Sequence, residues 1–308
     1  MLIGGNISAA GRAISIGGYR GENSNIFTKA GEALYVSGNI EANSDVFATY
    51  PDVIYIEGSI KHLSTSSGEV IHVGGDITTN SNSGQGVYVE GSISTSYSCL
   101  RVKGSMTATG AYAVTVDNDL TGTGGLYVGG SINATSMNGI YVKEGITSSS
   151  DAVNVGGTLE STVGNGITVG AITSKTYGVL VNGGITSSVG SAAVNISGSI
   201  TAGGKGVYVG GNIEANSDVG IHVNGNIEST DGDAIHVTGS ITGNDGSSGV
   251  YVDKGITVED GFGVIIHGGV VSTQSGGIVI HGDVSATDAN GVDIDGNISV
   301  LSTSNESS

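Results

Sequence analysis

Tyrosine and histidine recur at one position of a short repeated phrase, where they could form a binding platform. The phrase runs aliphatic residue, variable residue, then Val or Ile, and many copies have an aromatic residue or His in the middle. Stacked on a sheet, these rings could bind sugar rings or another rod, or simply stabilise the sheet by about 0.2–1 kcal/mol per pair. The candidates for this ligand-binding or packing column are Tyr127, Tyr141, Tyr208, His222, His236 and Tyr251.

Aspartates recur about ten to twelve residues after the first aliphatic residue of their phrase. In a stacked fold they would lie near one another at one edge, where carboxylate and carbonyl oxygens suit Ca²⁺. Aspartate is also a common turn residue that bonds its own backbone, which is the simpler interpretation. No cofactor is certain, and calcium is the ion to test at Asp218, Asp231, Asp233, Asp245 and Asp260.

Threonines occupy the outward position of a second short strand in each phrase. A regular threonine array could order water against ice, but Glu41, Lys61, Glu160, Glu214 and Glu228 interrupt it. Threonine is also a favoured residue on exposed strands. The sequence therefore favours ordinary surface strands over ice binding.

Catalytic patterns do not emerge from the sequence. Cys99 has no surrounding motif, and neither a nucleophile elbow, a phosphate-binding loop nor an HExxH helix occurs. Asp293 and Asp295 could be imagined as a glycosidase pair, but strand alternation places both on the outer side. We predict that the protein is not an enzyme.

The charge balance disfavours two classes of partner. The net charge is −18 and there are only 10 Lys and Arg residues, whereas nucleic acids and anionic membranes attract basic patches. No stretch approaches the eighteen apolar residues of a membrane helix. We therefore expect no nucleic acid partner and no membrane insertion.

A repeat of about fourteen residues organises the chain. It is clear at Val207, Ile221 and Ile235, and it continues at Val250 and Val264. A fixed period predicts a solenoid, in which each repeat buries its apolar side against its neighbours. We predict irregular N-terminal coils over 1–33, a regular solenoid over 34–300 and a polar tail over 301–308.

Each phrase has the alternation of a β-strand. Val207 and Val209 would point inward and Tyr208 outward, a second short strand begins at Ile213, and the many glycines exclude a helix. The expected fold is all-β, a single parallel β-solenoid of about twenty coils with about 14 residues each. At about 4.8 Å per coil, it would be roughly 95 Å long. The glycines in the turns are expected to have positive φ angles.

The phrase small-Val-x-Val/Ile-Gly-x-x-Ile-x-Ala resembles known β-solenoid surface proteins. It is similar to the β-roll head repeats of trimeric autotransporter adhesins, to Gly/Ser/Thr-rich bacterial carbohydrate-binding β-helices and, more loosely, to grass antifreeze β-rolls. It departs from the adhesin heads at Ile213, Ile227 and Ile241, where those heads prefer Ala. The resemblance implies an extracellular or cell-surface protein.

Two functions follow as hypotheses. The first is a non-enzymatic structural β-solenoid that assembles head to tail with copies of itself into a fibre, or forms an adhesin shaft. Its basis is that the repeat begins at Met1 and persists to Ile298, so a further copy could add at an open end. The alternative is a carbohydrate-binding surface module that uses the Tyr/His column to hold a polysaccharide and is stabilised by calcium.

Overall fold

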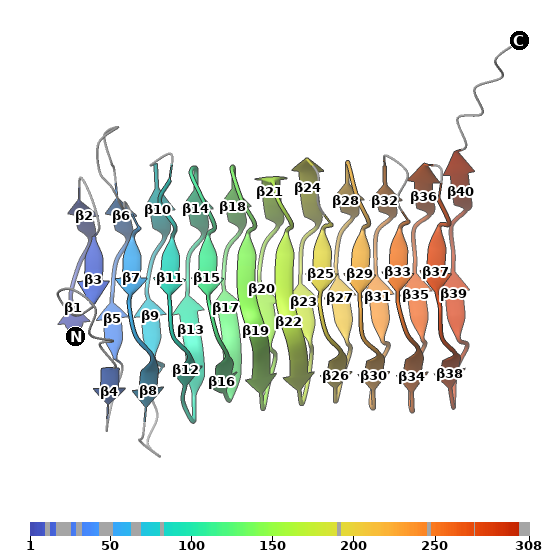
Figure 1. The fold of residues 1–308 in the computed structure, drawn as a ribbon, viewed down its shortest axis with the longest axis horizontal. Helices are drawn as coiled ribbons and strands as arrows, with labels where there is room; N and C mark the ends of the chain where they lie inside the picture. The colour runs from blue at the N-terminus through green and yellow to red at the C-terminus, as the bar shows by residue number, and fades with distance from the viewer. Residues whose placement is uncertain are drawn as a thin grey trace, which may run out of the picture.

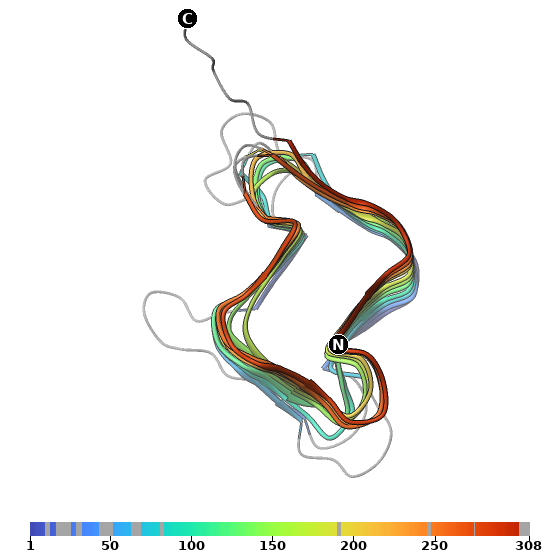
Figure 2. The ribbon, with the colours of Figure 1, turned by 90° about the vertical axis from the view of Figure 1, so that its right-hand side faces the viewer.

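The protein is a rod of stacked parallel β-strands (Figure 1). The computed structural model describes residues 1–9, 13–16, 26–28, 33–42, 52–62, 69–80, 83–189, 192–244, 248–273 and 275–301. All regular secondary structure in these ranges is β-strand. Viewed down the rod axis, successive coils superimpose and form one closed cross-section (Figure 2).

Within the described ranges, two sheets have eleven strands each. Sheet A contains β1 (Leu2–Ile3), β5 (Leu34–Val36), β9 (Ile71–Val73), β13 (Ser98–Val102), β17 (Gly124–Val128), β20 (Val153–Val155), β23 (Val179–Val181), β27 (Val207–Val209), β31 (Ile235–Val237), β35 (Val264–Ile266) and β39 (Val292–Ile294). Sheet B contains β2 (Ile7–Ala9), β6 (Ile40–Ala42), β10 (Ile77–Thr79), β14 (Met106–Ala108), β18 (Ile132–Ala134), β21 (Leu159–Val163), β24 (Ile185–Val189), β28 (Ile213–Ala215), β32 (Ile241–Gly243), β36 (Val270–Thr273) and β40 (Ile298–Leu301).

Sheet C has eighteen strands in the described part of the chain and combines two rows, because β19 and β22 run through both. The first row is β3 (Ile14–Ile16), β7 (Ile54–Ile56), β11 (Val87–Val89), β15 (Val114–Val116), β19 (Ile140–Ser148), β22 (Ile167–Ser174), β25 (Val194–Ile196), β29 (Ile221–Val223), β33 (Val250–Val252) and β37 (Ile278–Ile280). The second row adds β4 (Ile26–Thr28), β8 (Ile60–His62), β12 (Ile93–Ser94), β16 (Leu120–Gly122), β26 (Ile200–Ala202), β30 (Ile227–Ser229), β34 (Ile256–Val258) and β38 (Val284–Ala286).

Each coil contains two copies of the phrase, so the predicted coil of about 14 residues is wrong. Val207 pairs with Ile235, 28 residues later, while the intervening Ile221 lies in sheet C. Consecutive phrases thus form opposite walls, because a closed coil needs two walls to bury the aliphatic side chains that face each other. With eleven strands in sheets A and B, the stack is about 50 Å long at about 4.8 Å per coil, not the 95 Å expected from twenty coils.

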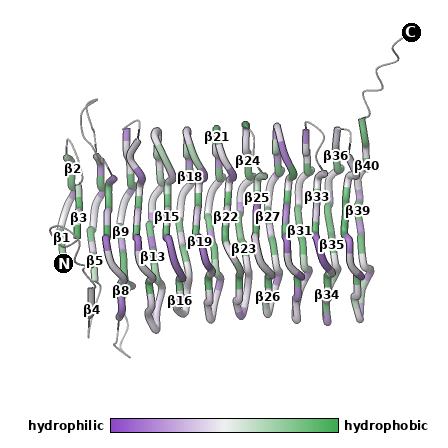
Figure 3. The backbone as a smooth tube through the Cα atoms, viewed as in Figure 1, coloured by the Kyte–Doolittle hydropathy of each residue, from purple (hydrophilic) through white to green (hydrophobic). Residues whose placement is uncertain are grey.

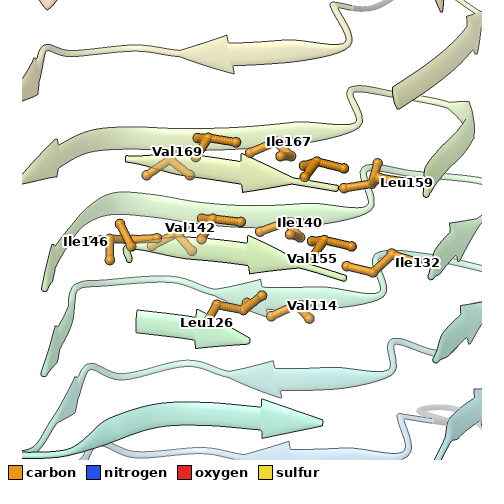
Figure 4. Packing of buried hydrophobic residues seen from close by; sticks show 14 of the residues in the cluster. Val114, Leu126, Ile132, Ile140, Val142, Ile146, Val155, Leu159, Ile167 and Val169 are labelled. Atoms are coloured by element: carbon orange, nitrogen blue, oxygen red, sulfur yellow. The ribbon is translucent and has the colours of Figure 1, made fainter. Parts of the chain in front are cut away.

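The inward side chains form continuous apolar columns. Leu126 and Val155 of sheet A pack with Val114 and Ile140 of sheet C, and Ile132 of sheet B lies beside them (Figure 4). These side chains are at most 1% exposed. The hydrophobic segments recur at matching places in successive coils (Figure 3). Two buried residues flank a half-buried one in strands such as β27 and β31, which confirms the alternation read from the sequence.

Small polar residues fill the narrow ends of the cross-section. The buried Ser161 and Ser187 hydroxyls donate to the turn carbonyls of Met137 and Gly164 at 2.7 and 2.8 Å. Ser148 does the same towards Thr123 at 2.7 Å. A hydroxyl at this inward position is therefore satisfied by the turn that it faces, as a buried polar group must be.

A side-chain ladder runs along the turn between sheets A and B. The Asn6 side-chain oxygen accepts from the Asn39 amide at 2.9 Å, and Asn39 in turn accepts from the Asp76 amide at 2.9 Å. Asp76 and Ser105 continue the same pattern towards Ser131. In each step the side-chain acceptor serves the next coil towards the C-terminus, so the ladder has a direction.

The turn glycines are required by close approach and not by positive φ, which corrects the expectation from the sequence. Among the described glycines, only Gly5, Gly164 and Gly261 have a positive φ. A Cβ at Gly239 would instead meet the carbonyl group of Gly211 in the preceding coil, 2.7 Å away. Glycine is needed there because successive turns stack backbone against backbone.

The strands within 1–33 join the same sheets as later strands: β1 pairs with β5, and β3 pairs with β7. At the other end, β40 runs to Leu301, and the rest of the predicted tail lies outside the described residues. No helix in the described part of the chain has the length and apolar character needed to cross a membrane.

Candidate functional site

The candidate aromatic positions form two columns on different sheets, not one. Tyr127, Tyr208 and His236 lie on the outer face of sheet A, whereas Tyr141, His222 and Tyr251 lie on that of sheet C. The split follows from the coil containing two phrases. The structure brings Tyr208 beside His236 and His222 beside Tyr251. Two coils without an aromatic residue or His at this position separate the other tyrosine of each sheet from these pairs.

On sheet A, each of two tyrosines has a cation beside its ring. The Arg101 guanidinium carbon lies 5.0 Å from the centre of the Tyr127 ring, and the Lys205 ammonium nitrogen lies 5.2 Å from that of Tyr208. Both distances are within the range of a cation–π interaction. Arg101 also donates to Glu69 at 2.7 Å, so its guanidinium is held in place from two sides.

Lys205, Asp233 and His236 form a compact polar cluster next to Tyr208. The Asp233 carboxylate lies 2.9 Å from the Lys205 ammonium and 2.8 Å from His236 Nδ1, and it accepts the Phe262 amide at 2.9 Å. Burial by itself would raise the pKa of Asp233. The bonds from His236, the Phe262 amide and Lys205 outweigh burial and hold that pKa well below its usual range.

On sheet C, the hydroxyls of two tyrosines are bonded to acids in the turn of the next coil. Tyr55 donates to Glu90 at 2.6 Å, and Tyr88 donates to Asp117 at 2.9 Å. Burial, followed by the bond to Asp117 and that acid's charge, raises the pKa of Tyr88. These hydroxyls are thus engaged within the sheet.

The C-terminal part of the sheet C column has a similar arrangement. The Tyr251 ring lies 5.1 Å from both His222 and His281, edge to face. Asp253, in the turn that follows, lies 4.0 Å from His222 and 3.8 Å from His281. Stacking of neighbouring coils accounts for these contacts.

Two grooves lie beside sheet A, where the chain enters its strands. The first groove is lined by Arg101, Gly124, Tyr127, Asp151 and Asn154, among others. The second groove is lined by Lys175, Tyr177, Gly204, Lys205 and Asp231, among others. Tyrosine, cationic and carboxylate side chains are therefore combined in both grooves.

The predicted calcium ligands are only partly brought together. Asp231 and Asp260 follow equivalent strands of adjacent coils, Asp233 is held by Lys205 and His236, and Asp218 bonds the amide of Val219 at 2.7 Å. Asp245 lies outside the described residues. Within the described ranges, no group of three or more His, Cys, Asp or Glu residues could hold a metal ion, so calcium binding stays a prediction.

The threonine positions are also divided between two sheets. Thr121, Thr147, Thr173 and Thr201 follow one another on the second row of sheet C, whereas Thr78 and Thr107 lie on sheet B. Glu228 ends the run of four on sheet C. Each sheet therefore carries a shorter row of threonines than the sequence suggested.

Cys99, in β13, is buried in the hydrophobic core of the solenoid. Burial raises the pKa of its thiol to about 12. A thiol held neutral in this way is a poor nucleophile. Its position therefore gives no support to cysteine chemistry.

Sequence reasoning missed the charged groups that border the sheet A column. Arg101 occupies the outward position of its phrase, where other copies have an aromatic residue or His, and Asp151 and Lys205 precede sheet A strands outside the phrase. One signal was available: an acid occurs three residues before a histidine in both Glu69–His72 and Asp233–His236, and the structure pairs both. That spacing could have placed two of the polar clusters before the fold was known.

Comparison with known proteins does not narrow these possibilities. No protein-family model matches the chain, and no curated protein or solved structure is detectably similar to it. The chain is shown to be a parallel β-solenoid by its own strand pairing, and its function must be argued from its surfaces.

Proposed function

We propose that this protein is a non-enzymatic structural β-solenoid, extracellular or at a cell surface, that assembles head to tail into a fibre or an adhesin-like shaft. The observation that carries this proposal is the constant register. From Val207 to Val292, the sheet A strands pair one coil after another without a shift. A surface that repeats in this way fits a further coil of the same shape.

The last described coils expose side chains that are buried elsewhere. Val292 is 44% exposed, although its partner Val264 is fully buried, and Ile298 is 54% exposed, although Val270 is fully buried. At the opposite end the inward Ile3 is only half-buried, although its partner Val36 is fully buried. Covering these apolar faces would be favourable, and the open strand edges would gain backbone partners.

The polarity of the side-chain ladder supports a head-to-tail arrangement. Each ladder oxygen accepts from the following coil, so the pattern continues only when the C-terminal face of one copy meets the N-terminal face of another. Asn297 would then take the role that Asn6 has towards Asn39. A head-to-head contact would place acceptors against acceptors.

The length of particles in solution tests this proposal. We expect the wild-type protein to form particles longer than the single stack of about 50 Å in negative-stain electron microscopy, increasingly so with concentration. Ile298→Lys places a charge on the end face and should leave single rods. Val271→Lys, on the half-exposed side of the same sheet, is the matched control and should still assemble.

Only single rods of the wild type at every concentration would contradict the proposal. So would equal assembly of the two variants, because the end face would then play no part. Circular dichroism should show the same β-sheet signal for all three proteins, which excludes unfolding as the cause of lost assembly.

The second candidate is a carbohydrate-binding surface module. The observation in its favour is that both grooves border sheet A and contain tyrosine beside groups that can bond to hydroxyls. Polysaccharide retention in native gels tests it. Calcium is a separate part of this candidate: a stabilising ion at Asp218, Asp231 or Asp260 would raise the melting temperature over that measured with a chelator.

A further inference from the structure

The two grooves lie on one side of the rod and follow each other along its axis. The first groove borders β13, β17 and β20, and the second borders β23, β27 and β31. These six strands are consecutive in sheet A. The grooves therefore occupy adjacent stretches of the same face.

Small residues border both grooves. Gly124 pairs with Ser98, and the next coil has Ser150 and Asp151 in this region. In the second groove, Gly203 and Gly204 lie between Lys175 of one coil and Asp231 of the next. A Cβ at Gly203 would meet the backbone of Lys175, so this glycine is required by close approach of the coils, whereas a Cβ at Gly124 would meet only Ser98.

Asp151 connects the two grooves. Its carboxylate accepts from the Asn154 side-chain amide at 2.8 Å within the first groove. At the start of the second groove, it also accepts from the Thr176 hydroxyl and, at 3.3 Å, from the Tyr177 backbone amide. One acid thus fixes the polar groups of both grooves relative to each other.

The groups in the grooves suit a sugar. Tyr127 and Tyr177 provide aromatic rings for the apolar faces of sugar rings. The Asp151 carboxylate and the Asn154 side-chain amide can bond to pairs of hydroxyls, and Arg101 also lines the first groove. A few placed polar groups beside aromatic surface are typical of a small-molecule or glycan site.

We propose that the two grooves form a single track that binds a linear, neutral polysaccharide lying parallel to the rod axis. The coils present the track at a regular spacing of about 4.8 Å, which suits an extended polymer better than a compact ligand. The net charge of −18 and the acids in the lining disfavour a polyanion. The inference rests on the carbohydrate-binding candidate and is independent of fibre formation.

Gly124 offers a way to block the track without breaking the fold. A Cβ there would meet only the side chain of Ser98, whereas one at the adjacent Gly125 would meet the backbone carbonyl of Ala152. Gly124→Gln should therefore fill the first groove while the coil keeps its shape. Tyr177→Ala removes the ring from the second groove. Tyr112→Ala, before β15 of sheet C, is the matched control, and Tyr141→Ala tests the column of sheet C.

Affinity electrophoresis of the full chain tests the track, with hydroxyethylcellulose, galactomannan and xyloglucan as neutral probes and polygalacturonate as the acidic probe. We expect at least one neutral polymer to retard the wild type. Gly124→Gln and Tyr177→Ala should each weaken that binding by about tenfold, the effect of about 1.4 kcal/mol. Tyr112→Ala should change it less than about twofold.

The outcomes distinguish failure of the carbohydrate-binding candidate from failure of the track. No retardation by any polymer would overturn both the carbohydrate-binding candidate and the track. Retardation that Tyr141→Ala weakens, but Gly124→Gln and Tyr177→Ala do not, would keep the candidate function and overturn the track. Retardation by polygalacturonate alone would overturn the proposed neutral ligand.

Discussion

The outer faces of sheets A and C are made from alternate copies of one phrase, yet they engage their tyrosines differently. On sheet C, the Tyr55 and Tyr88 hydroxyls are bonded to Glu90 and Asp117. On sheet A, Tyr127 instead has the Arg101 guanidinium beside its ring, and no described residue bonds its hydroxyl. The hydroxyls of Tyr55 and Tyr88 are thus engaged by acids, whereas no described residue bonds that of Tyr127.

This difference shows which parts of a repeat are constrained by the fold. Inward positions such as Leu126 and Ile140 must be apolar on both faces because they meet across the same core (Figure 4). Outward positions have no such requirement, so their neighbours decide what they do. Functional differences between the faces must therefore be sought outside the core.

The largest expected effect tests whether the two inner surfaces are equivalent. Leu126→Ala on sheet A and Ile140→Ala on sheet C each remove a fully enclosed side chain, so each should lower the free energy of unfolding by about 2–5 kcal/mol. Urea unfolding followed by circular dichroism measures both. A loss confined to one variant would show that the two walls do not share the core equally.

Breaking the polar cluster of sheet A should have a smaller effect. Asp233→Asn leaves Lys205 and His236 without their buried counter-charge, and we expect a loss of about 2 kcal/mol at pH 7. Asp253→Asn on sheet C is the matched control, because its carboxylate is more exposed and lies 3.8 Å or more from its histidines. Equal losses in the two variants would contradict the contrast between the faces.

The stability lost in Asp233→Asn should depend on pH in a known direction. The pKa of Asp233 is lower in the folded protein than in the unfolded chain, where it is about 3.9. Its ionised form therefore stabilises the fold fully above about pH 4, and that stability is lost as the pH falls towards the folded pKa. The difference between wild type and Asp233→Asn should accordingly shrink as the pH is lowered from 5 to 2.

Several features could be predicted from the sequence because they depend on local spacing. Val207 and Val209 face inward and Tyr208 outward, as the alternation indicated. The parallel stacking of equivalent positions also follows from the repeat. Both properties are fixed by strand geometry within a few residues.

The size of the coil could not be read from the same spacing. A phrase of about 14 residues is compatible with a whole coil or half of one, and only the long-range pairing of Val207 with Ile235 decides between them. The division of the aromatic column between two faces depends on that choice. The candidate grooves were missed for a related reason: Gly124 and Asp151 come together only when separate coils are stacked.

The smallest expected effect tests the hydroxyl contrast between the faces directly. Tyr88→Phe removes the bond to Asp117 and should lower the free energy of unfolding by about 1 kcal/mol, the usual contribution of such a bond. Tyr127→Phe removes a hydroxyl that no described residue bonds and should change stability by much less. Thermal melts of the two variants beside the wild type provide the comparison. Titration of tyrosine absorbance adds a second measure: because the pKa of Tyr88 is raised, Tyr88→Phe should leave the phenols that ionise near pH 10 unchanged, whereas a fall in their number would show that the Tyr88 hydroxyl is not held by the sheet.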